Sequence, residues 1–211
     1  FSNLATLCIT NNEESTIWNL CDYKAACYAG TEQGIAATKS FTSQMLCLIL
    51  ISLKLVEKIH GDNATIGYKK SLFSLPAVVD KALAKREDIK KLAAILAKEN
   101  TIVITADGIS YSLAKEAALK IKETSYKNIS AAILGEFMHG HVAVLNNPSM
   151  LIYIAVDEIS KRSVSNLNKI KEDYKPKLVI IGPAGEEVKP DCNINIVSEN
   201  EIQQMFANVV I

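Results

Sequence analysis

The chain has 211 residues and carries 23 Lys plus Arg against 23 Asp plus Glu, so its formal net charge is zero. This length allows one or two domains with a substantial core. The sequence contains no basic stripe or long Lys/Arg run of the kind that neutralises a phosphate backbone. We therefore expect no nucleic-acid partner.

The five cysteines include no CxxC pair, so we expect no metal site. Cys8, Cys27 and Cys47 stand in apolar surroundings, where a free thiol behaves as a small hydrophobe, and we interpret them as reduced thiols of a cytoplasmic protein. The longest apolar run, Met45 to Ile51, is too short to cross a bilayer, and no signal peptide opens the chain. No membrane partner is expected.

The first predicted elements are a strand at 4–10, a short helix at 13–20 that starts near Ser15 or Thr16, and a second strand at 24–28. A polar loop leads to a long helix that Thr38 or Ser40 can cap. This helix is apolar on most sides before Lys54, so we expect it to be buried between layers or at a subunit contact. Gly61 ends it.

The second half alternates strands with helices. Residues 62–73 form a connector with little pattern, and helices are expected at 74–84, 86–98, after Gly108, at 159–172 and at 199–210. Strands are expected at 101–105, 129–133, 150–156, 177–181 and 193–197. The alternation predicts an α/β fold with a doubly wound parallel sheet and flanking helices. The strand–glycine turn–helix order at 101–108 is typical of places where such folds bind phosphate or sugar.

Two parts of the chain share a plan. LATLCIT, Cys21-Asp22 and KAACY near the start match KLVII, Asp191-Cys192 and NINIV near the end, at an offset of about 170 residues. We therefore expect a tandem arrangement. Residues 1–60 would be the C-terminal part of a first unit, 61–98 a helical linker, and 99–211 a second unit whose last helix is truncated.

The helix after Gly108 carries an acid, a base and an acid on one edge. At about 100° per residue, Glu116, Lys120 and Glu123 form a narrow stripe, opposite small residues such as Ala114 and Ala118. Such a stripe is ordinarily a set of solvated salt bridges. The loop that follows, with glycines beside Glu136 and His139, suits a backbone wrapped around a ligand and favours a site instead.

Three motifs resemble those of the tandem sugar isomerase (SIS) domain family. They are AGTEQGIAATKSFT at 29–42, EAALKIKETSY at 116–126 and GEFMHG at 135–140. The family includes the isomerase half of glutamine–fructose-6-phosphate amidotransferases and stand-alone relatives such as glucosamine-6-phosphate deaminases and fructosamine-phosphate deglycases. The resemblance covers essentially the whole chain.

The resemblance implies an aldose–ketose interconversion of a sugar phosphate through an enediol, without a cofactor. It assigns Glu123 as the base, Lys120 as the cation beside the developing oxyanion and Glu116 as a further acid. His139 matches a ring-opening histidine that relatives take from the neighbouring subunit, which implies a homodimer. The substrate-binding residues that it implies are Ile35, Ala37, Thr38, Glu32, Gly135 and Glu136.

The chain departs from the family pattern at three positions. Ala37 replaces a Ser, Met138 a Lys and His141 a Pro. The family's Ser/Thr-rich phosphate loop, which would precede Phe1, and its C-terminal tail with a lysine fall outside residues 1–211, and their presence in the parent protein stays open. The amidotransferase isomerase, a stand-alone deaminase or isomerase, and a non-catalytic sugar-phosphate sensor all stay open, and the presence of all four catalytic-type residues favours an enzyme. His141 is either a pocket residue or a dimer contact.

Overall fold

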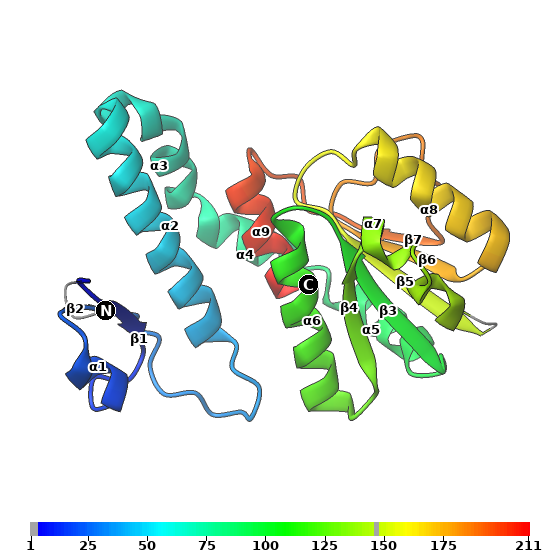
Figure 1. Ribbon diagram of the computed structural model, residues 1–211, viewed down its shortest axis with the longest axis horizontal. Coiled ribbons are helices and arrows are strands. Elements are labelled where there is room, and N and C mark those ends of the chain that lie inside the picture. Colours follow the sequence, from blue (N-terminus) through cyan, green and yellow to red (C-terminus); the bar gives the residue numbers. More distant parts are fainter. Residues whose placement is uncertain (1–3, 146–147) are drawn as a thin grey trace. The chain divides into compact units, whose positions relative to one another are not determined.

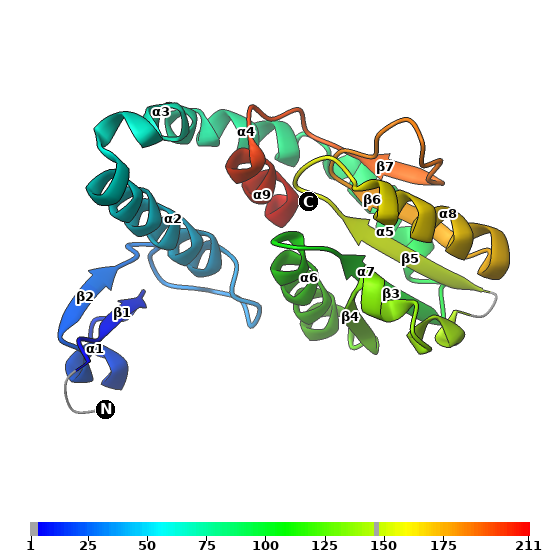
Figure 2. The same cartoon turned by 45° about the horizontal axis from the view of Figure 1, so that its top comes forward.

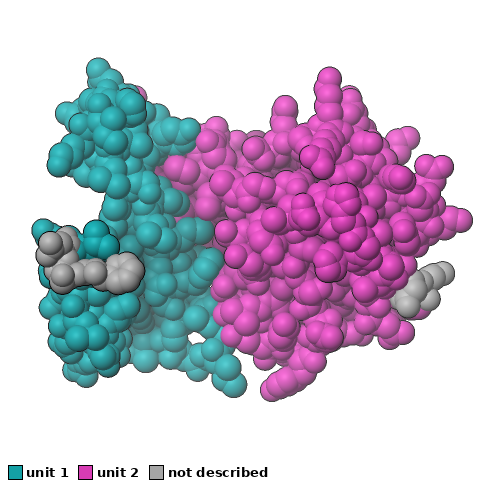
Figure 3. Space-filling view, viewed as in Figure 1, with its two compact units in different colours: residues 1–69 teal, residues 70–211 magenta. Residues whose placement is uncertain are grey.

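The computed structural model describes residues 4–145 and 148–211, and the chain divides into two compact units, 1–69 and 70–211 (Figure 3). The helices at 75–83 and 86–96 belong to the second of these units. The three-part division at 60 and 98 concerns a tandem pair of domains, and it stays a prediction.

The first unit contains a two-stranded parallel sheet and a long helix (Figure 1). Its elements are β1 (Leu7–Thr10), α1 (Thr16–Leu20), β2 (Tyr23–Ala26), α2 (Lys39–His60) and η1 (Asp62–Thr65), and α3 (Ile66–Phe73) begins in it. The expected start of α1 near Ser15 or Thr16 is confirmed: the helix begins at Thr16, and the Ser15 hydroxyl caps it by accepting a hydrogen bond from the Trp18 amide. Residues 62–73, the part of the expected helical linker with little sequence pattern, form η1 and the whole of α3, and they follow the Gly61 break directly.

The long helix α2 is not buried between layers, the first of its two expected settings, and the second, a subunit contact, stays a prediction. Within the described chain only Ser40, Met45, Leu53 and Glu57 are buried on it, and Leu48, Leu55 and Ile59 are exposed. It is also long and apolar enough to span a membrane by length and composition, with a mean hydropathy of 1.4 in its best window. The uninterrupted apolar run at 45–51 covers only part of this length. Core helices of globular domains can have the same length and apolar composition, so one such helix is weak evidence of a membrane span.

A buried carboxylate fixes the junction after α2. The Glu57 side chain is 2% exposed and contacts three partners: the Thr65 hydroxyl, the Lys69 ammonium and, at 3.2 Å, the Lys54 ammonium. The hydrogen bond from Lys69, followed by that from Thr65, lowers the Glu57 pKa from 4.5 to about 2. The ionised carboxylate thus ties the end of α2 to η1 and α3.

The second unit is built on five parallel strands in the order β4-β3-β5-β6-β7. Its strands are β3 (Thr101–Ala106), β4 (Ile129–Ile133), β5 (Ser149–Ile154), β6 (Lys177–Ile181) and β7 (Cys192–Ile194). Its helical segments are α4 (Leu75–Leu83), α5 (Arg86–Leu96), α6 (Ser110–Ser125), α7 (Leu134–Phe137), η2 (His141–Val144), α8 (Lys161–Tyr174) and α9 (Glu201–Val210). The predicted α/β fold with a doubly wound parallel sheet is confirmed.

The central strands are apolar throughout because helices cover both faces of the sheet. Val103, Leu151 and Ile180 pack against α7 and α8 on one face. Their neighbours along the strands, among them Ile104 and Ile152, line the other face together with residues of α5, α6 and α9. The ribbon shows helices on both sides of the sheet (Figure 2). The side chains that alternate along each strand therefore form two cores, one on each face of the sheet. Helix α6 packs against one of these faces, and its other side is turned to solvent.

One glycine is required where the last helix meets the sheet. At Gly182, with φ 107°, a Cβ would overlap the Ala155 carbonyl oxygen. That carbonyl accepts a 2.7 Å hydrogen bond from the buried Asn208 side chain of α9, and Gln204 donates to Asn208 in turn. A side chain at 182 would separate α9 from the end of β5.

The buried Glu57 makes the first unit acid-sensitive. Its lowered pKa contributes stability that is fully present above about pH 4.5 and is lost as the pH falls towards about 2. We expect the thermal unfolding midpoint of Glu57→Gln to fall less than that of wild type when the pH is lowered over this interval. Fluorescence of Trp18, the single tryptophan, reports unfolding of the first unit directly. Glu14→Gln, at an exposed position in the same unit, should keep the wild-type pH dependence; an equal flattening there would contradict the assignment.

Candidate active site

Helix α6 presents the predicted stripe as a connected ion-pair array. The Lys120 ammonium lies 2.8 Å from a Glu123 carboxylate oxygen and 3.4 Å from one of Glu116. The three side chains are only 20–28% exposed. Hydrogen bonding to Glu123 raises the Lys120 pKa against the opposing effect of burial. Lys120 is therefore a firmly protonated cation between two carboxylates.

Local sequence explains why the array stands there. Gly108, with φ 53°, turns the chain from β3 into α6, and Leu113, Ala114 and Ala118 bury the opposite side of the helix. The small side chains of these alanines let α6 lie close to the sheet. The ion-pair stripe is thereby held on the side of α6 opposite them. The helix ends at Ser125; the next residue, Tyr126, has a left-handed backbone, and its amide donates to the Lys122 carbonyl oxygen.

The side chain of Asp107, in the turn between β3 and α6, is hydrogen-bonded to other residues of the second unit. The Asp107 carboxylate accepts hydrogen bonds from the Tyr153 hydroxyl at 3.1 Å and the Ser163 hydroxyl at 2.8 Å. Burial, and then the Asp107 charge, raise the Tyr153 pKa, so this hydroxyl remains a donor. A carboxylate at this helix start disfavours a phosphate there. The sequence indicated the turn but not this internal network.

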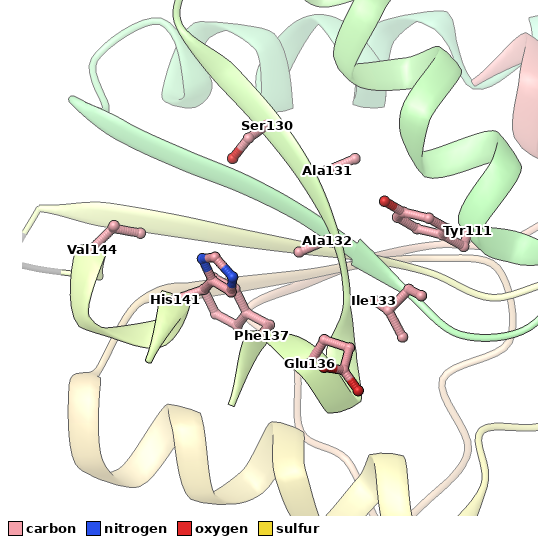
Figure 4. Close-up of a pocket in the computed structure, with 9 residues that line it drawn as sticks. All are labelled: Tyr111, Ser130, Ala131, Ala132, Ile133, Glu136, Phe137, His141 and Val144. Atoms are coloured by element: carbon pink, nitrogen blue, oxygen red, sulfur yellow. The ribbon is translucent and has the colours of Figure 1, made fainter. Parts of the chain in front are cut away.

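The loop after β4 contributes to a separate cavity (Figure 4). Glu136 and His141 line a space of about 380 Å³ together with the Tyr111 side chain of α6 and Ser130 of the edge strand β4. This finding places His141 in a pocket, one of its two predicted settings. Tyr111 and Ser130 were missed, because an aromatic and a hydroxyl on opposite elements carry no shared sequence signal. Gly135 is partly buried, with the Arg162 guanidinium near its Cα.

His139 lies outside this cavity lining and is exposed, and its amide donates to the Glu136 carbonyl oxygen at 3.0 Å. The stripe also faces away from the cavity, since Glu116 follows Tyr111 by about 140° around α6. The second unit therefore holds two groups of predicted residues: the stripe, and the cavity with Glu136.

In the first unit, Glu32 organises the turn that precedes α2. One of its carboxylate oxygens accepts hydrogen bonds from the Thr38 amide (3.0 Å), the Ser40 amide (2.8 Å) and the Ser40 hydroxyl (2.7 Å). Thr38 and Ser40 had been the expected caps, but neither hydroxyl caps the helix, because an ionised carboxylate is the stronger acceptor. The Ser40 hydrogen bonds lower the Glu32 pKa.

The same turn borders a cavity of about 720 Å³ at the carboxyl ends of β1 and β2. Glu32 and Ser40 line it with Thr10, Asn11 and Gln44 among others. The remaining turn residues differ in exposure: Ile35 is 92% exposed and Ala37 is partly buried. Among residues 4–145 and 148–211, no group of three or more His, Cys, Asp or Glu side chains could hold a metal ion.

Removing the Glu32 carboxylate should loosen this turn. We expect amide hydrogen exchange at Thr38 and Ser40 to accelerate roughly five- to tenfold in Glu32→Ala, because both amides lose their acceptor. Exchange measured by NMR checks this, with Gln33→Ala, at an exposed position beside it, as control. Unchanged protection in Glu32→Ala would show that the backbone holds the turn without the carboxylate.

Comparisons with known proteins agree with the fold and the motifs. A family model described as SIS domain matches residues 95–211. A glutamine–fructose-6-phosphate aminotransferase [isomerizing] of Legionella pneumophila is 32% identical over 168 residues, 79% of this chain and 27% of that protein. The chain thus spans a little over a quarter of the length of the curated relatives that it matches.

Solved structures show the same architecture. The C-terminal domain of glucosamine-fructose-6-phosphate aminotransferase from Francisella tularensis superimposes with a TM-score of 0.90 at 25% identity, over 98% of this chain and 60% of that chain. A glucosamine-6-phosphate deaminase from Thermotoga maritima gives a TM-score of 0.68 at 21% identity, over 97% of this chain and 58% of that chain, which shows a shared fold. The family model, the relatives and the fold agree: the chain belongs to the SIS domain family.

Proposed function

We propose that this chain is the isomerase part of a cytoplasmic enzyme that resembles glutamine–fructose-6-phosphate aminotransferases. It would catalyse aldose–ketose isomerisation of a sugar phosphate by enediol proton transfer, acting on fructose 6-phosphate or glucosamine 6-phosphate. The observation that carries the proposal is the Glu116–Lys120–Glu123 array, partly buried and connected, within the motif shared with the family. The 32% identity to an aminotransferase of this kind supports the substrate class.

Proton transfer between C1 and C2 needs a base beside carbon and a positive charge near the oxygen that becomes anionic. Glu123 is the proposed base, and Lys120 is the proposed cation. The raised Lys120 pKa supports that role, because a protonated ammonium is required throughout the working pH range. Glu116, on the other side of Lys120, would hold the ammonium in place and act as the further acid.

The remaining roles complete the site. The turn anchored by Glu32, with Ile35, Ala37 and Thr38, would contact the sugar through its backbone. Gly135 and Glu136 would shape the loop that carries His139, and the exposed His139 would assist ring opening in the site of a second copy of the chain. A homodimer of tandem SIS units, without a cofactor, is therefore part of the proposal.

Proteins of the same fold catalyse other reactions, and the experiment below distinguishes these alternatives. A deaminase would release ammonia from glucosamine 6-phosphate, a deglycase would act on a fructosamine phosphate, and a sensor would bind a sugar phosphate without turnover. The amine source and the proton exchange separate these cases.

The first test is solvent exchange. The full-length protein is incubated with fructose 6-phosphate or glucosamine 6-phosphate in deuterated water, and deuterium at the sugar C1 and C2 is followed by NMR. We expect exchange in wild type and a loss of about 10²–10⁴-fold in Glu123→Gln, because the amide cannot accept the proton. Supply of glutamine or free ammonia then distinguishes an aminotransferase from a deaminase.

The matched control is Glu87→Gln on α5. Glu87 also pairs with a lysine three residues away, at 2.7 Å from Lys90, but it lies in an exposed pair outside the proposed site. Exchange should stay within about twofold of wild type there. Tight binding of sugar phosphate to wild type without any exchange would refute the enzyme and leave the sensor.

Mixing two inactive variants tests the shared site. If Glu123 and His139 act on one substrate from different chains, co-refolded Glu123→Gln and His139→Asn should recover about a quarter of wild-type activity, because half of the dimers carry one intact site. Activity that stays at the sum of the separate variants would place both residues in one chain's site.

A further inference from the structure

Tyr28 has a backbone conformation that its place in the chain does not explain. Among residues 4–145 and 148–211, three non-glycine residues have a left-handed backbone: Tyr28 (φ 50°), Tyr126 (φ 58°) and Lys175 (φ 52°). Tyr126 and Lys175 each directly follow a helix, where this conformation commonly closes the last turn. Tyr28 instead comes after strand β2, which ends at Ala26. A non-glycine residue held in this region without such a reason points to a functional constraint.

One side chain from the neighbouring strand holds Tyr28 in this conformation. Asn11 directly follows β1, and its amide group reaches the turn after β2. Its Oδ1 accepts a hydrogen bond from the Ala29 amide at 2.8 Å, and its Nδ2 donates to the Gly30 carbonyl oxygen at 2.7 Å. Ahead of Tyr28, the Cys27 amide donates to the last carbonyl oxygen of β1 at 3.0 Å. The backbone is therefore fixed on both sides of Tyr28.

The Tyr28 side chain is available to a ligand. It is 85% exposed and lines the 720 Å³ cavity of the first unit. Most of the remaining lining residues carry hydroxyl, amide or carboxylate groups, such as Thr31 and Gln44. An aromatic ring beside such groups suits the hydroxyl-bearing part of a sugar, whose C–H face can pack on the ring. The charged lining residues within the described chain are Glu13 and Glu32, which disfavour a phosphate group in the cavity.

We propose that Tyr28 is a sugar-contacting residue and that Asn11 is its positioning residue. The Tyr28 ring would pack against the C–H face of the carbohydrate part of a sugar phosphate, and the choice of a sugar phosphate rests on the proposed function. Tyr28 precedes the motif at 29–42, so the family resemblance assigns it no role. Ile35 and Ala37 do not line the cavity, so this contact is additional to those of the Glu32-anchored turn.

The test measures binding of fructose 6-phosphate to the full-length protein by calorimetry, in a Glu123→Gln background that suppresses the proposed turnover. We expect the Kd to rise about tenfold in Tyr28→Gly, which removes the ring, and to stay within about threefold in Tyr28→Phe, which keeps it. Tyr23→Ala, which removes an exposed tyrosine of the same strand outside the cavity lining, should bind like its parent. A Kd for Tyr28→Gly within about twofold of the parent would overturn the proposal.

Stability separates a ligand contact from a packing role. Glycine adopts a left-handed backbone without strain, so the Trp18-monitored thermal midpoint of Tyr28→Gly should stay within about 3 °C of wild type or exceed it. A larger fall, together with lost binding, would make Tyr28 a packing residue and overturn the proposal.

A double-mutant cycle tests the role of Asn11. If Asn11 acts through Tyr28, Asn11→Ala should weaken binding about five- to tenfold when Tyr28 is present and by less than about twofold in Tyr28→Gly. Equal losses in both backgrounds would refute the positioning role. Binding that depends on Tyr28, without hydrogen exchange in the wild-type protein, would refute the proposed enzyme and leave the contact. Exchange in wild type with unchanged binding in Tyr28→Gly would refute the contact alone.

Discussion

The second unit depends on one constraint: a parallel sheet that is apolar on both faces must be covered on both faces. Strands β3, β5 and β6 carry apolar side chains at almost every position, so α7 and α8 close one face while α5, α6 and α9 close the other. This requirement holds α6 against the sheet through Leu113, Ala114 and Ala118. The Glu116–Lys120–Glu123 array therefore stands on a rigid support rather than on a loop.

The first unit uses buried or half-buried carboxylates in the same supporting way. The Glu32 carboxylate accepts hydrogen bonds from Ser40 at the start of α2, and the Glu57 carboxylate binds Lys54 near its end. In both cases an ionised side chain accepts several hydrogen bonds at once, which is why both pKa values fall. A two-stranded sheet buries few apolar side chains of its own. Hydrogen bonds to carboxylates therefore stabilise the turns of the first unit, including the Glu32 turn beside its cavity.

The α6 helix also separates two regions with different chemistry. Its stripe combines two carboxylates and a cation, which suits proton transfer on a sugar. Its first turn offers Tyr111 to a different space, shared with Glu136 and His141. Motif similarity joins Glu136 with the stripe residues in one site, and the geometry of the second unit keeps them apart on two sides of one helix.

The sequence by itself determined the fold class, nearly every strand of the second unit, and the stripe on α6, because these rest on period-2 and period-3.6 patterns that local residues encode. It also carried the family motifs. Tertiary structure alone decided that Glu32 rather than Thr38 or Ser40 anchors α2, that Glu57 ties the end of α2 to η1 and α3, and that His141 faces a pocket. Each of these depends on groups distant in sequence, whose contacts exist only once the chain has folded.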